Sequence, residues 1–244
     1  MLQKLKIDYL DGDVLLEGYY AYDDSIKERR PVVLVAHDWS GKNEFSCHKA
    51  DQLAELGYVG FALDMYGKGK AGNTKDEKAA LMAPLIEDRV KLQRRILAAL
   101  ETVKKLDHTA SGQIGAIGFC FGGLCVLDLA RSGADVKGVV SFHGLLHAPE
   151  HTAEHRIRAK VLALHGFDDP MVTPDKVLAF GQEMTYAKVD WQLHVYGNAM
   201  HAFTNPQAND PDFGTVYEKN ADMRSWTAMR SFFKEVFGSE PDSI

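Results

Sequence analysis

Short runs of consecutive apolar residues recur along the chain, and each run ends at a polar residue or at glycine. Pro31–Ala36 stops at His37, and Ile114–Ile117 stops at Gly118. Unbroken apolar runs of this length are typical of strands that are buried on both faces, as the central strands of a parallel sheet are. Similar runs cover Tyr58–Leu63, Val136–Phe142, Lys160–Leu164 and Trp191–Val195.

Between these runs, apolar residues recur at the spacing of one helix face. One such stretch is Ile86–Val103 and another is Met223–Val236. Thr173 followed by Pro174 is typical of an N-cap and a first-turn proline, so we expect a third helix that continues through Met184. The alternation of strands and helices predicts an α/β fold with a mainly parallel central sheet and helices on both faces.

The N-terminal part and the composition complete this picture. Leu5–Leu10 and Val14–Tyr22 alternate apolar and polar positions, which predicts an antiparallel ribbon at the sheet edge. The 244 residues contain no internal repeat or linker, so we expect one domain over residues 1–244. A net charge of −6, from 28 Lys and Arg against 34 Asp and Glu, argues against nucleic-acid binding, which needs clustered positive charge.

The cellular setting is predicted from two further features. No apolar run approaches the roughly 18 residues of a membrane span, and aspartates follow the N-terminus too closely for a secretory leader. We therefore expect no membrane association and a reducing, cytoplasmic location. The three cysteines form no CxxC pair, so neither a disulfide framework nor a metal site is expected, and no cofactor is predicted. They are Cys47, Cys120 and Cys125.

One strand-to-helix junction carries a candidate nucleophile. The sequence Gly118-Phe-Cys120-Phe-Gly122 follows a buried run and precedes a helix, which is the G-x-nucleophile-x-G pattern of a nucleophile elbow. Glycine is needed on both sides because a side chain there would collide with the neighbouring strand and helix. A cysteine at a helix start is favoured as thiolate, and the N–H of Phe121 is expected to face an oxyanion. The alternative is a packed core cysteine, which is the interpretation preferred for Cys125.

Two later loops supply a base and an acid in the chain order that an elbow nucleophile requires. The strand ending at His165 is followed by Asp168 and Asp169, and the next strand is followed by His201. We predict a Cys120–His201–Asp169 triad, in which Asp169 is preferred to Asp168 because it lies beyond the end of the strand.

These motifs resemble those of the dienelactone hydrolase family, within the α/β-hydrolase superfamily. The resemblance covers nearly the whole chain and is most specific at the cysteine elbow. It implies an α/β-hydrolase fold and an enzyme that cleaves carboxylic esters or lactones, of the carboxymethylenebutenolidase type. The segments that carry it are Arg30–Gly41, Leu63–Gly67, Gly118–Gly123, the Asp169 loop and Met200–Phe203.

The resemblance also implies roles for residues near the first central strand. The second oxyanion N–H is expected from Trp39. The preceding position, often glutamate in the family, contacts the resting cysteine; here it is Asp38, which is one methylene shorter, and the alternative is a loop-capping acid. Family members that act on dienelactone have an arginine soon after the catalytic histidine, where this chain has 204–206, Thr-Asn-Pro.

Other charged or metal-binding patterns are interpreted more simply. His143, at the end of a strand, is expected to line the pocket. Histidines recur every four residues from His143 through His147 and His151 to His155, but Gly and Pro interrupt a helix there, so a pocket wall is preferred to a metal site. Three arginines before the elbow are expected on a solvated helix face rather than at the substrate. They are Arg89, Arg94 and Arg95.

The predicted function is hydrolysis of an ester or lactone through a thioester acyl-enzyme. The expected partner is a small-molecule substrate, and the protein is expected to be a monomer or a weak homo-oligomer. Two alternatives remain open: a thioesterase or peptidase using the same triad, and a catalytically silent hydrolase scaffold that binds a ligand or senses thiol chemistry.

Overall fold

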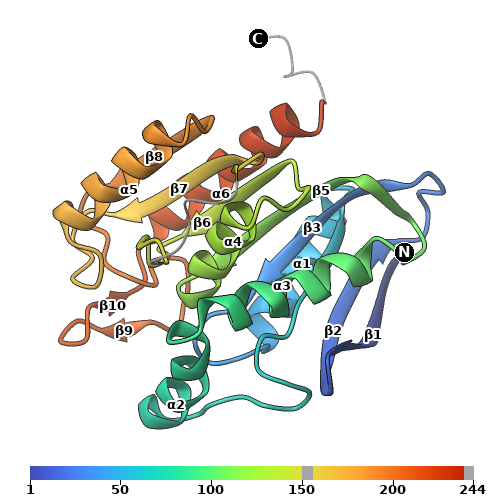
Figure 1. Ribbon diagram of the computed structural model, residues 1–244, viewed down its shortest axis with the longest axis horizontal. Helices are drawn as coiled ribbons and strands as arrows, with labels where there is room; N and C mark the ends of the chain where they lie inside the picture. Colours follow the sequence, from blue (N-terminus) through green and yellow to red (C-terminus); the bar gives the residue numbers. More distant parts are fainter. Residues whose placement is uncertain (150–155, 239–244) are drawn as a thin grey trace.

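An eight-stranded sheet in the order β1-β2-β4-β3-β5-β6-β7-β8 forms the centre of the computed structural model, which describes residues 1–149 and 156–238 (Figure 1). The β1–β2 and β2–β4 pairs are antiparallel, and the other pairs are parallel. The predicted edge ribbon and mainly parallel sheet are therefore present. The strands are β1 (Leu2–Asp11), β2 (Val14–Asp23), β3 (Arg30–Ala36), β4 (Val59–Ala62), β5 (Thr109–Phe119), β6 (Gly138–Phe142), β7 (Lys160–Gly166) and β8 (Trp191–Tyr196).

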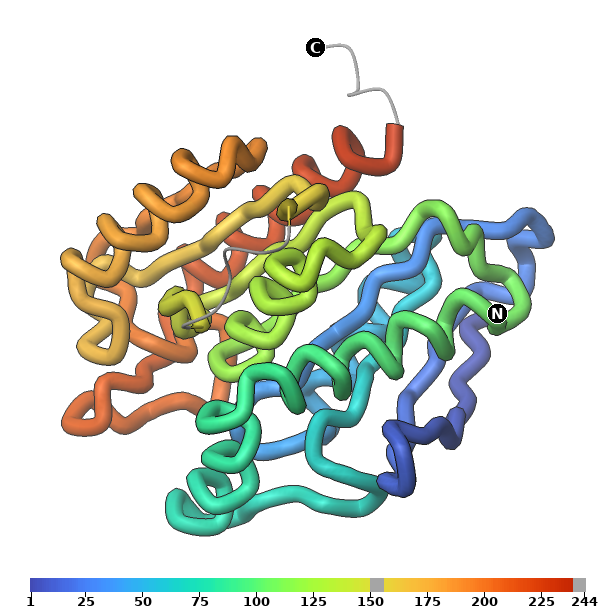
Figure 2. The backbone as a smooth tube through the Cα atoms, in the orientation of Figure 1, coloured from blue at the N-terminus to red at the C-terminus, as the bar shows by residue number. Residues whose placement is uncertain are grey.

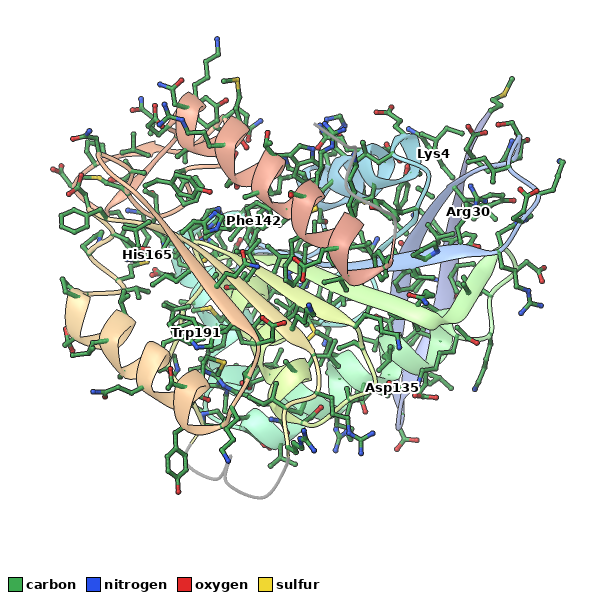
Figure 3. All side chains as sticks on the ribbon, turned by 90° about the horizontal axis from the view of Figure 1, so that it is seen from above. Lys4, Arg30, Asp135, Phe142, His165 and Trp191 are labelled. Atoms are coloured by element: carbon green, nitrogen blue, oxygen red, sulfur yellow. The ribbon has the colours of Figure 1, made fainter. Side chains whose placement is uncertain are left out.

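Helices cover both faces of this sheet, as predicted. The apolar residues of α1 and α6 belong to one buried cluster, and those of α3, α4 and α5 belong to another on the opposite face. Figure 3 shows the red α6 and the orange α5 on opposite sides of the strands. None of the described helices is long and apolar enough to cross a membrane. The helices are α1 (Glu44–Glu55), α2 (Lys75–Ile86), α3 (Arg89–Val103), α4 (Phe121–Arg131), α5 (Pro174–Tyr186) and α6 (Lys219–Val236).

One predicted helix boundary was wrong. The stretch Ile86–Val103 was interpreted as continuous, but Ile86 ends α2 and a separate helix, α3, begins at Arg89. The Asp88 side chain accepts a hydrogen bond from the Lys91 N–H at 2.9 Å, so it caps α3 at its first turn. An N-cap that satisfies a free N–H starts a new helix even where the apolar spacing continues.

The carboxyl end of the sheet is covered by two segments that are distant in sequence. A short pair of strands, β9 (Asn209–Asp210) and β10 (Thr215–Val216), lies at the same end of the molecule as α2 (Figures 1 and 2). Lys75 at the start of α2 forms an ion pair of 2.7 Å with Asp210. The two segments therefore meet over the ends of the central strands.

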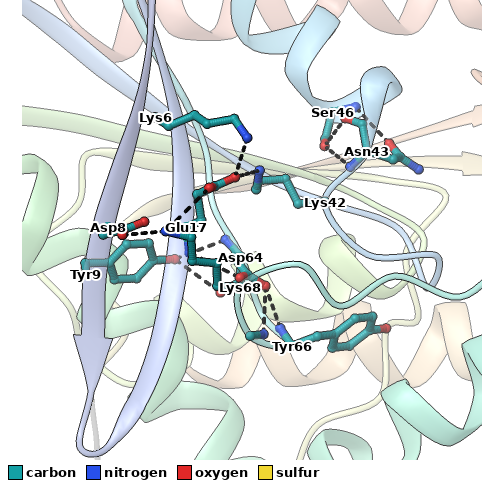
Figure 4. Close-up of polar contacts among 11 residues, drawn as sticks. Lys6, Asp8, Tyr9, Glu17, Lys42, Asn43, Ser46, Asp64, Tyr66 and Lys68 are labelled. Atoms are coloured by element: carbon teal, nitrogen blue, oxygen red, sulfur yellow. Dashed lines mark hydrogen bonds and ion pairs between the residues drawn. The ribbon is translucent and has the colours of Figure 1, made fainter.

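A polar network anchors the loop after β4 to the edge ribbon (Figure 4). The buried Asp64 carboxylate accepts hydrogen bonds from the N–H groups of Glu17, Tyr66 and Gly67 at 3.2, 2.9 and 2.9 Å. The Tyr9 hydroxyl bonds both backbone groups of Asp64. Asp64 lies just after the end of β4, and its carboxylate fixes the loop there through these backbone contacts.

A second network fixes the loop after β6. The buried Asp128 carboxylate accepts two bonds from Arg89, at 2.6 and 2.7 Å, and one from Arg131 at 3.3 Å. Both guanidinium groups also donate to carbonyl groups of this loop, Arg131 to Leu146 at 2.9 Å and each of them to His147 at 3.3 Å. Buried charged side chains therefore hold in place a loop that lies outside the strands.

The interpretation of the three arginines as a solvated face was wrong for two of them. Arg89 binds Asp128, and the buried Arg95 binds Asp11 at 2.7 Å and the Met65 carbonyl at 2.8 Å. Only Arg94 is largely exposed, with 61% of its side chain accessible. The buried carboxylates that neutralise these cations lie on other elements, so the helical spacing alone could not reveal them.

We predict that Asp128→Ala lowers the free energy of unfolding by about 3–5 kcal/mol, because it leaves buried guanidinium groups without their carboxylate. The matched control is Glu101→Ala, which removes an exposed partner of Lys104 and should cost less than about 1 kcal/mol. Urea unfolding followed by circular dichroism measures both values. Equal losses in the two variants would show that the buried network does not stabilise this fold.

Candidate active site

The junction of β5 and α4 is a sharp bend with Cys120 in a left-handed conformation, at φ 55° and ψ −115°. A side chain on Gly118 would place its Cβ 2.0 Å from the Gly122 carbonyl oxygen. A side chain on Gly122 would place its Cβ 2.2 Å from the Ala36 carbonyl oxygen. Both contacts are far inside van der Waals distance, so glycine is required at both positions. The bend predicted from the Gly-x-Cys-x-Gly pattern is present.

Backbone hydrogen bonds hold the Cys120 bend in place. The Cys120 N–H donates to the Phe142 carbonyl at 3.0 Å, and the Cys120 carbonyl accepts from the Gly123 N–H at 3.0 Å. Phe121 is the first residue of α4, so its N–H has no acceptor within the helix and lies at the positive end of the helix dipole. No acceptor for this N–H is found in the described part of the chain, so the half-buried Cys120 side chain lies beside a donor that can stabilise negative charge.

The histidine and the acid predicted to act with Cys120 are joined by a short hydrogen bond. His201 Nδ1–H donates to Asp169 Oδ2 at 2.7 Å, and both side chains are buried. Asp169 Oδ1 accepts from the Met171 N–H at 2.8 Å, which fixes the carboxylate. Asp168 is exposed. The structure thus places Asp169, rather than Asp168, against the imidazole.

The charge of His201 is controlled by its neighbours. Burial lowers the pKa of His201, but the interaction with Cys120 and the hydrogen bond to Asp169 raise it by more, and the resulting pKa is about 10. The imidazole is therefore held as imidazolium at neutral pH. Its buried Nε2 atom forms no hydrogen bond of good geometry with any described residue, although Cys120 acts on the ring, so this nitrogen is available for proton exchange at the cysteine.

Cys120 and His201 open into a cavity of about 830 Å³. Asp38, Trp39 and His143 also line it, so five of the predicted residues border the same space. Asp169 lies behind His201, and Phe121 is buried at the start of α4.

Part of the cavity wall was not predicted from the sequence. Lys75 and Lys78 of α2 and Phe213 of the β9–β10 turn line it. The Phe213 ring stacks on Trp39 at 5.5 Å, and the Lys78 ammonium lies 5.6 Å from the Trp39 ring centre. These contacts join residues far apart in the chain, and no local motif marks them.

Asp38 adopts the loop-capping arrangement that was the alternative to a cysteine contact. Its Oδ1 accepts a hydrogen bond from the Ser40 N–H at 2.7 Å. In the described part of the chain, the carboxylate forms no hydrogen bond with Cys120. Asp38 therefore borders the cavity while its carboxylate holds the turn.

His143 lies at the cavity wall, against the candidate base. Its ring is 5.3 Å from the His201 ring, and its Nε2 lies 2.8 Å from the Thr204 hydroxyl. Burial, with the positive charge of His201, holds the pKa of His143 well below its usual range, so the ring is neutral. Thr204, which follows the candidate base where dienelactone-cleaving relatives are expected to carry arginine, is thus engaged with His143.

The histidine run does not form a helix where it is described. Residues 143–149 form an irregular loop, and His151 and His155 lie outside the described residues. Within residues 1–149 and 156–238, no group of three or more His, Cys, Asp or Glu side chains is arranged to hold a metal ion.

Comparison with known proteins gives consistent matches along the chain. The model of the dienelactone hydrolase family matches residues 16–237. A relative from Aquifex aeolicus, named "Putative carboxymethylenebutenolidase", is 30% identical over 233 residues, which are 93% of this chain and 96% of that relative.

Solved structures agree with this match. The crystal structure of P91, described as a dienelactone hydrolase-like promiscuous phosphotriesterase from metagenomic libraries, has a TM-score of 0.93 and 36% identity, covering 97% of this chain and 99% of P91. A structure named m3DLH has a TM-score of 0.92 and 37% identity over the same shares of the two chains.

The raised pKa of His201 generates a prediction about its titration. In the wild-type protein, the imidazole should stay protonated through neutral pH and lose its proton near pH 10. Cys120→Ala removes the negative charge that raises this pKa, so the titration of His201 should move to lower pH. NMR of the imidazole C–H groups measures both curves, and His201→Gln identifies the resonance. An unchanged titration in Cys120→Ala would show that the thiolate does not act on His201.

Proposed function

The chain belongs to the dienelactone hydrolase family, and we propose that it hydrolyses carboxylic esters or lactones with Cys120 as nucleophile, His201 as acid and base, and Asp169 as the group that orients His201. One observation carries the proposal. The left-handed Cys120 borders the same cavity as a buried imidazole whose other nitrogen is bound to Asp169 at 2.7 Å.

The first half of the reaction transfers the acyl group to sulfur. The Cys120 thiolate attacks the substrate carbonyl carbon, and the carbonyl electron pair moves onto oxygen. The N–H groups of Phe121 and Trp39 stabilise the resulting oxyanion. As the carbonyl reforms, the C–O bond to the alcohol breaks, and the alkoxide takes the proton of the His201 imidazolium. The products of this half are a thioester on Cys120 and a free hydroxyl group.

The second half hydrolyses the thioester. Neutral His201 takes a proton from water, the oxygen of which attacks the thioester carbonyl, and collapse of the second tetrahedral intermediate returns the electron pair to sulfur. The acid is released, and the thiolate–imidazolium pair is restored. Asp169 holds the Nδ1–H tautomer throughout and balances the charge of the imidazolium. A lactone follows the same steps but gives a single hydroxy acid.

A second activity is favoured by the similarity to P91, which is described as a promiscuous phosphotriesterase. In a phosphotriester the thiolate would attack phosphorus, and the N–H groups of Phe121 and Trp39 would face a phosphoryl oxygen. The leaving alkoxide would again take the His201 proton, and water would cleave the sulfur–phosphorus bond. We propose this as a side activity of the same nucleophile.

We predict that Cys120→Ala abolishes hydrolysis of an aryl acetate without unfolding the protein. His201→Ala should lower kcat/KM on the order of 10³-fold or more, because it removes proton transfer in both halves of the reaction. Cys47→Ala, at a half-buried cysteine that does not line the cavity, serves as the control and should keep wild-type activity.

The same variants are assayed on an aryl acetate, a small lactone, an acyl thioester and an aryl phosphotriester, with circular dichroism as the check on folding. Turnover of the acetate or lactone that depends on Cys120 supports the proposal. Full acetate and lactone activity in Cys120→Ala, or no turnover of either by the wild-type protein, contradicts it; the second result would instead fit a silent scaffold.

A further inference from the structure

In the turn after β3, the backbone N–H of Trp39 differs from the two N–H groups that follow it. The Ser40 N–H donates to Asp38 Oδ1 at 2.7 Å, and the Gly41 N–H donates to the Asp38 carbonyl at 3.3 Å. For the Trp39 N–H, no acceptor is found among the described residues, and Trp39 lines the cavity. The turn therefore satisfies the two donors that follow Trp39 and leaves the N–H of Trp39 for another acceptor.

A buried imidazole controls the peptide group to which this N–H belongs. His37 is completely buried, and its Nε2 accepts a hydrogen bond from the Met65 N–H at 3.1 Å. Since Nε2 is the acceptor, the ring proton is on Nδ1, and Nδ1–H donates to the Asp38 carbonyl at 2.5 Å. Burial lowers the pKa of His37, which keeps the ring neutral and this tautomer in place.

Because a peptide group is planar, this contact also sets the direction of the Trp39 N–H. The Asp38 carbonyl and the Trp39 N–H belong to one planar trans peptide, so they point in opposite directions. Holding the carbonyl toward the buried His37 ring turns the Trp39 N–H away from that ring, and the cavity is lined by Trp39 but not by His37. A carbonyl that accepts a strong hydrogen bond also makes the N–H of its own peptide a better donor.

Tyr66 fixes the next peptide and contacts the second donor residue. Its hydroxyl donates to the Trp39 carbonyl at 3.0 Å. Its ring lies 4.8 Å from the His37 ring and stacks on the Phe121 ring at 5.7 Å. The Asp64 carboxylate in turn accepts the Tyr66 N–H at 2.9 Å (Figure 4). One buried tyrosine therefore touches both residues whose N–H groups face the oxyanion in the proposed reaction.

We propose that His37 and Tyr66 are positioning residues that aim the Trp39 N–H at the oxyanion of the tetrahedral intermediate. His37 orients the donating peptide through its carbonyl, and Tyr66 fixes the following peptide. This role rests on the proposed hydrolase function, and neither side chain touches the substrate.

Two substitutions of His37 separate its two hydrogen bonds. In His37→Asn, the amide N–H₂ can replace Nδ1–H and keep the bond to the Asp38 carbonyl. In His37→Gln, the longer side chain can replace Nε2 as acceptor for Met65 but loses the bond to Asp38. We expect kcat for an aryl acetate to fall about 10- to 100-fold in His37→Gln, with KM little changed, and to fall less in His37→Asn. His48→Gln, at an exposed position of α1, is the control and should match the wild type.

Alkylation of Cys120 by iodoacetamide distinguishes misdirection of the N–H from damage to the nucleophile. This displacement at an sp³ carbon forms no oxyanion, so its rate should be unchanged in His37→Gln and in Tyr66→Phe, while acylation by the aryl acetate slows in both. Tyr66→Phe keeps the ring contacts and removes only the bond to the Trp39 carbonyl, so it tests the role should His37→Gln fail to fold.

Three results would overturn the positioning role. One is a loss of the alkylation rate that matches the loss of the acylation rate. The others are equal kcat values in His37→Gln and His37→Asn, and a wild-type kcat in both His37→Gln and Tyr66→Phe. If aryl acetate hydrolysis survives in Cys120→Ala, the proposed function itself fails and the positioning role is overturned with it. Hydrolysis that depends on Cys120 but not on His37 or Tyr66 overturns only the positioning role.

Discussion

The left-handed bend at Cys120 is the constraint on which the rest of the site depends. It lets α4 begin directly at the end of β5, so that the first turn of the helix packs against the backbone of two neighbouring strand ends. A Cβ on Gly122 would meet the Ala36 carbonyl, and a Cβ on Gly123 would lie 2.6 Å from the Cα of Gly144. Because these contacts are made by backbone atoms, the bend fixes where the loops after β3 and β6 lie relative to the Cys120 sulfur. A non-glycine residue is held in this conformation only because the surrounding structure determines it.

Those loops receive their shape from buried polar side chains rather than from ladders of backbone hydrogen bonds. His37, Asp64 and Tyr66 bind the turn that carries Trp39 and the loop after β4, while Asp128 and its two arginines bind the carbonyl groups of the loop after β6. Buried groups that are fully hydrogen-bonded specify one arrangement, because any other leaves a charge or a donor unpaired. This chain has the α/β-hydrolase fold, and the buried polar side chains beneath the two loops shape its cavity.

Much of this arrangement could be predicted from the sequence where the constraint is local. The elbow was predictable because the steric need for glycine on both sides of the cysteine is contained within five residues. Asp169 was predictable because a carboxylate that follows a buried strand lies where the chain leaves the sheet. The boundary between α2 and α3 was missed because Asp88 caps a helix within an uninterrupted apolar pattern. The burial of Arg89 and Arg95 and the ion pair of Lys75 with Asp210 beside the cavity depend on partners from 39 to 135 residues away, and local spacing carries no information about them.

The central claim, that the acyl group passes through Cys120, is tested most directly by trapping the acyl-enzyme. A hindered aryl ester such as a pivalate should acylate quickly and deacylate slowly, so acid-quenched protein can be digested and weighed by mass spectrometry. We expect one pivaloyl group on the peptide that contains Cys120, removable by a free thiol as a thioester is. Acylation of another residue, or continued turnover with no acylated protein at any time, would contradict it.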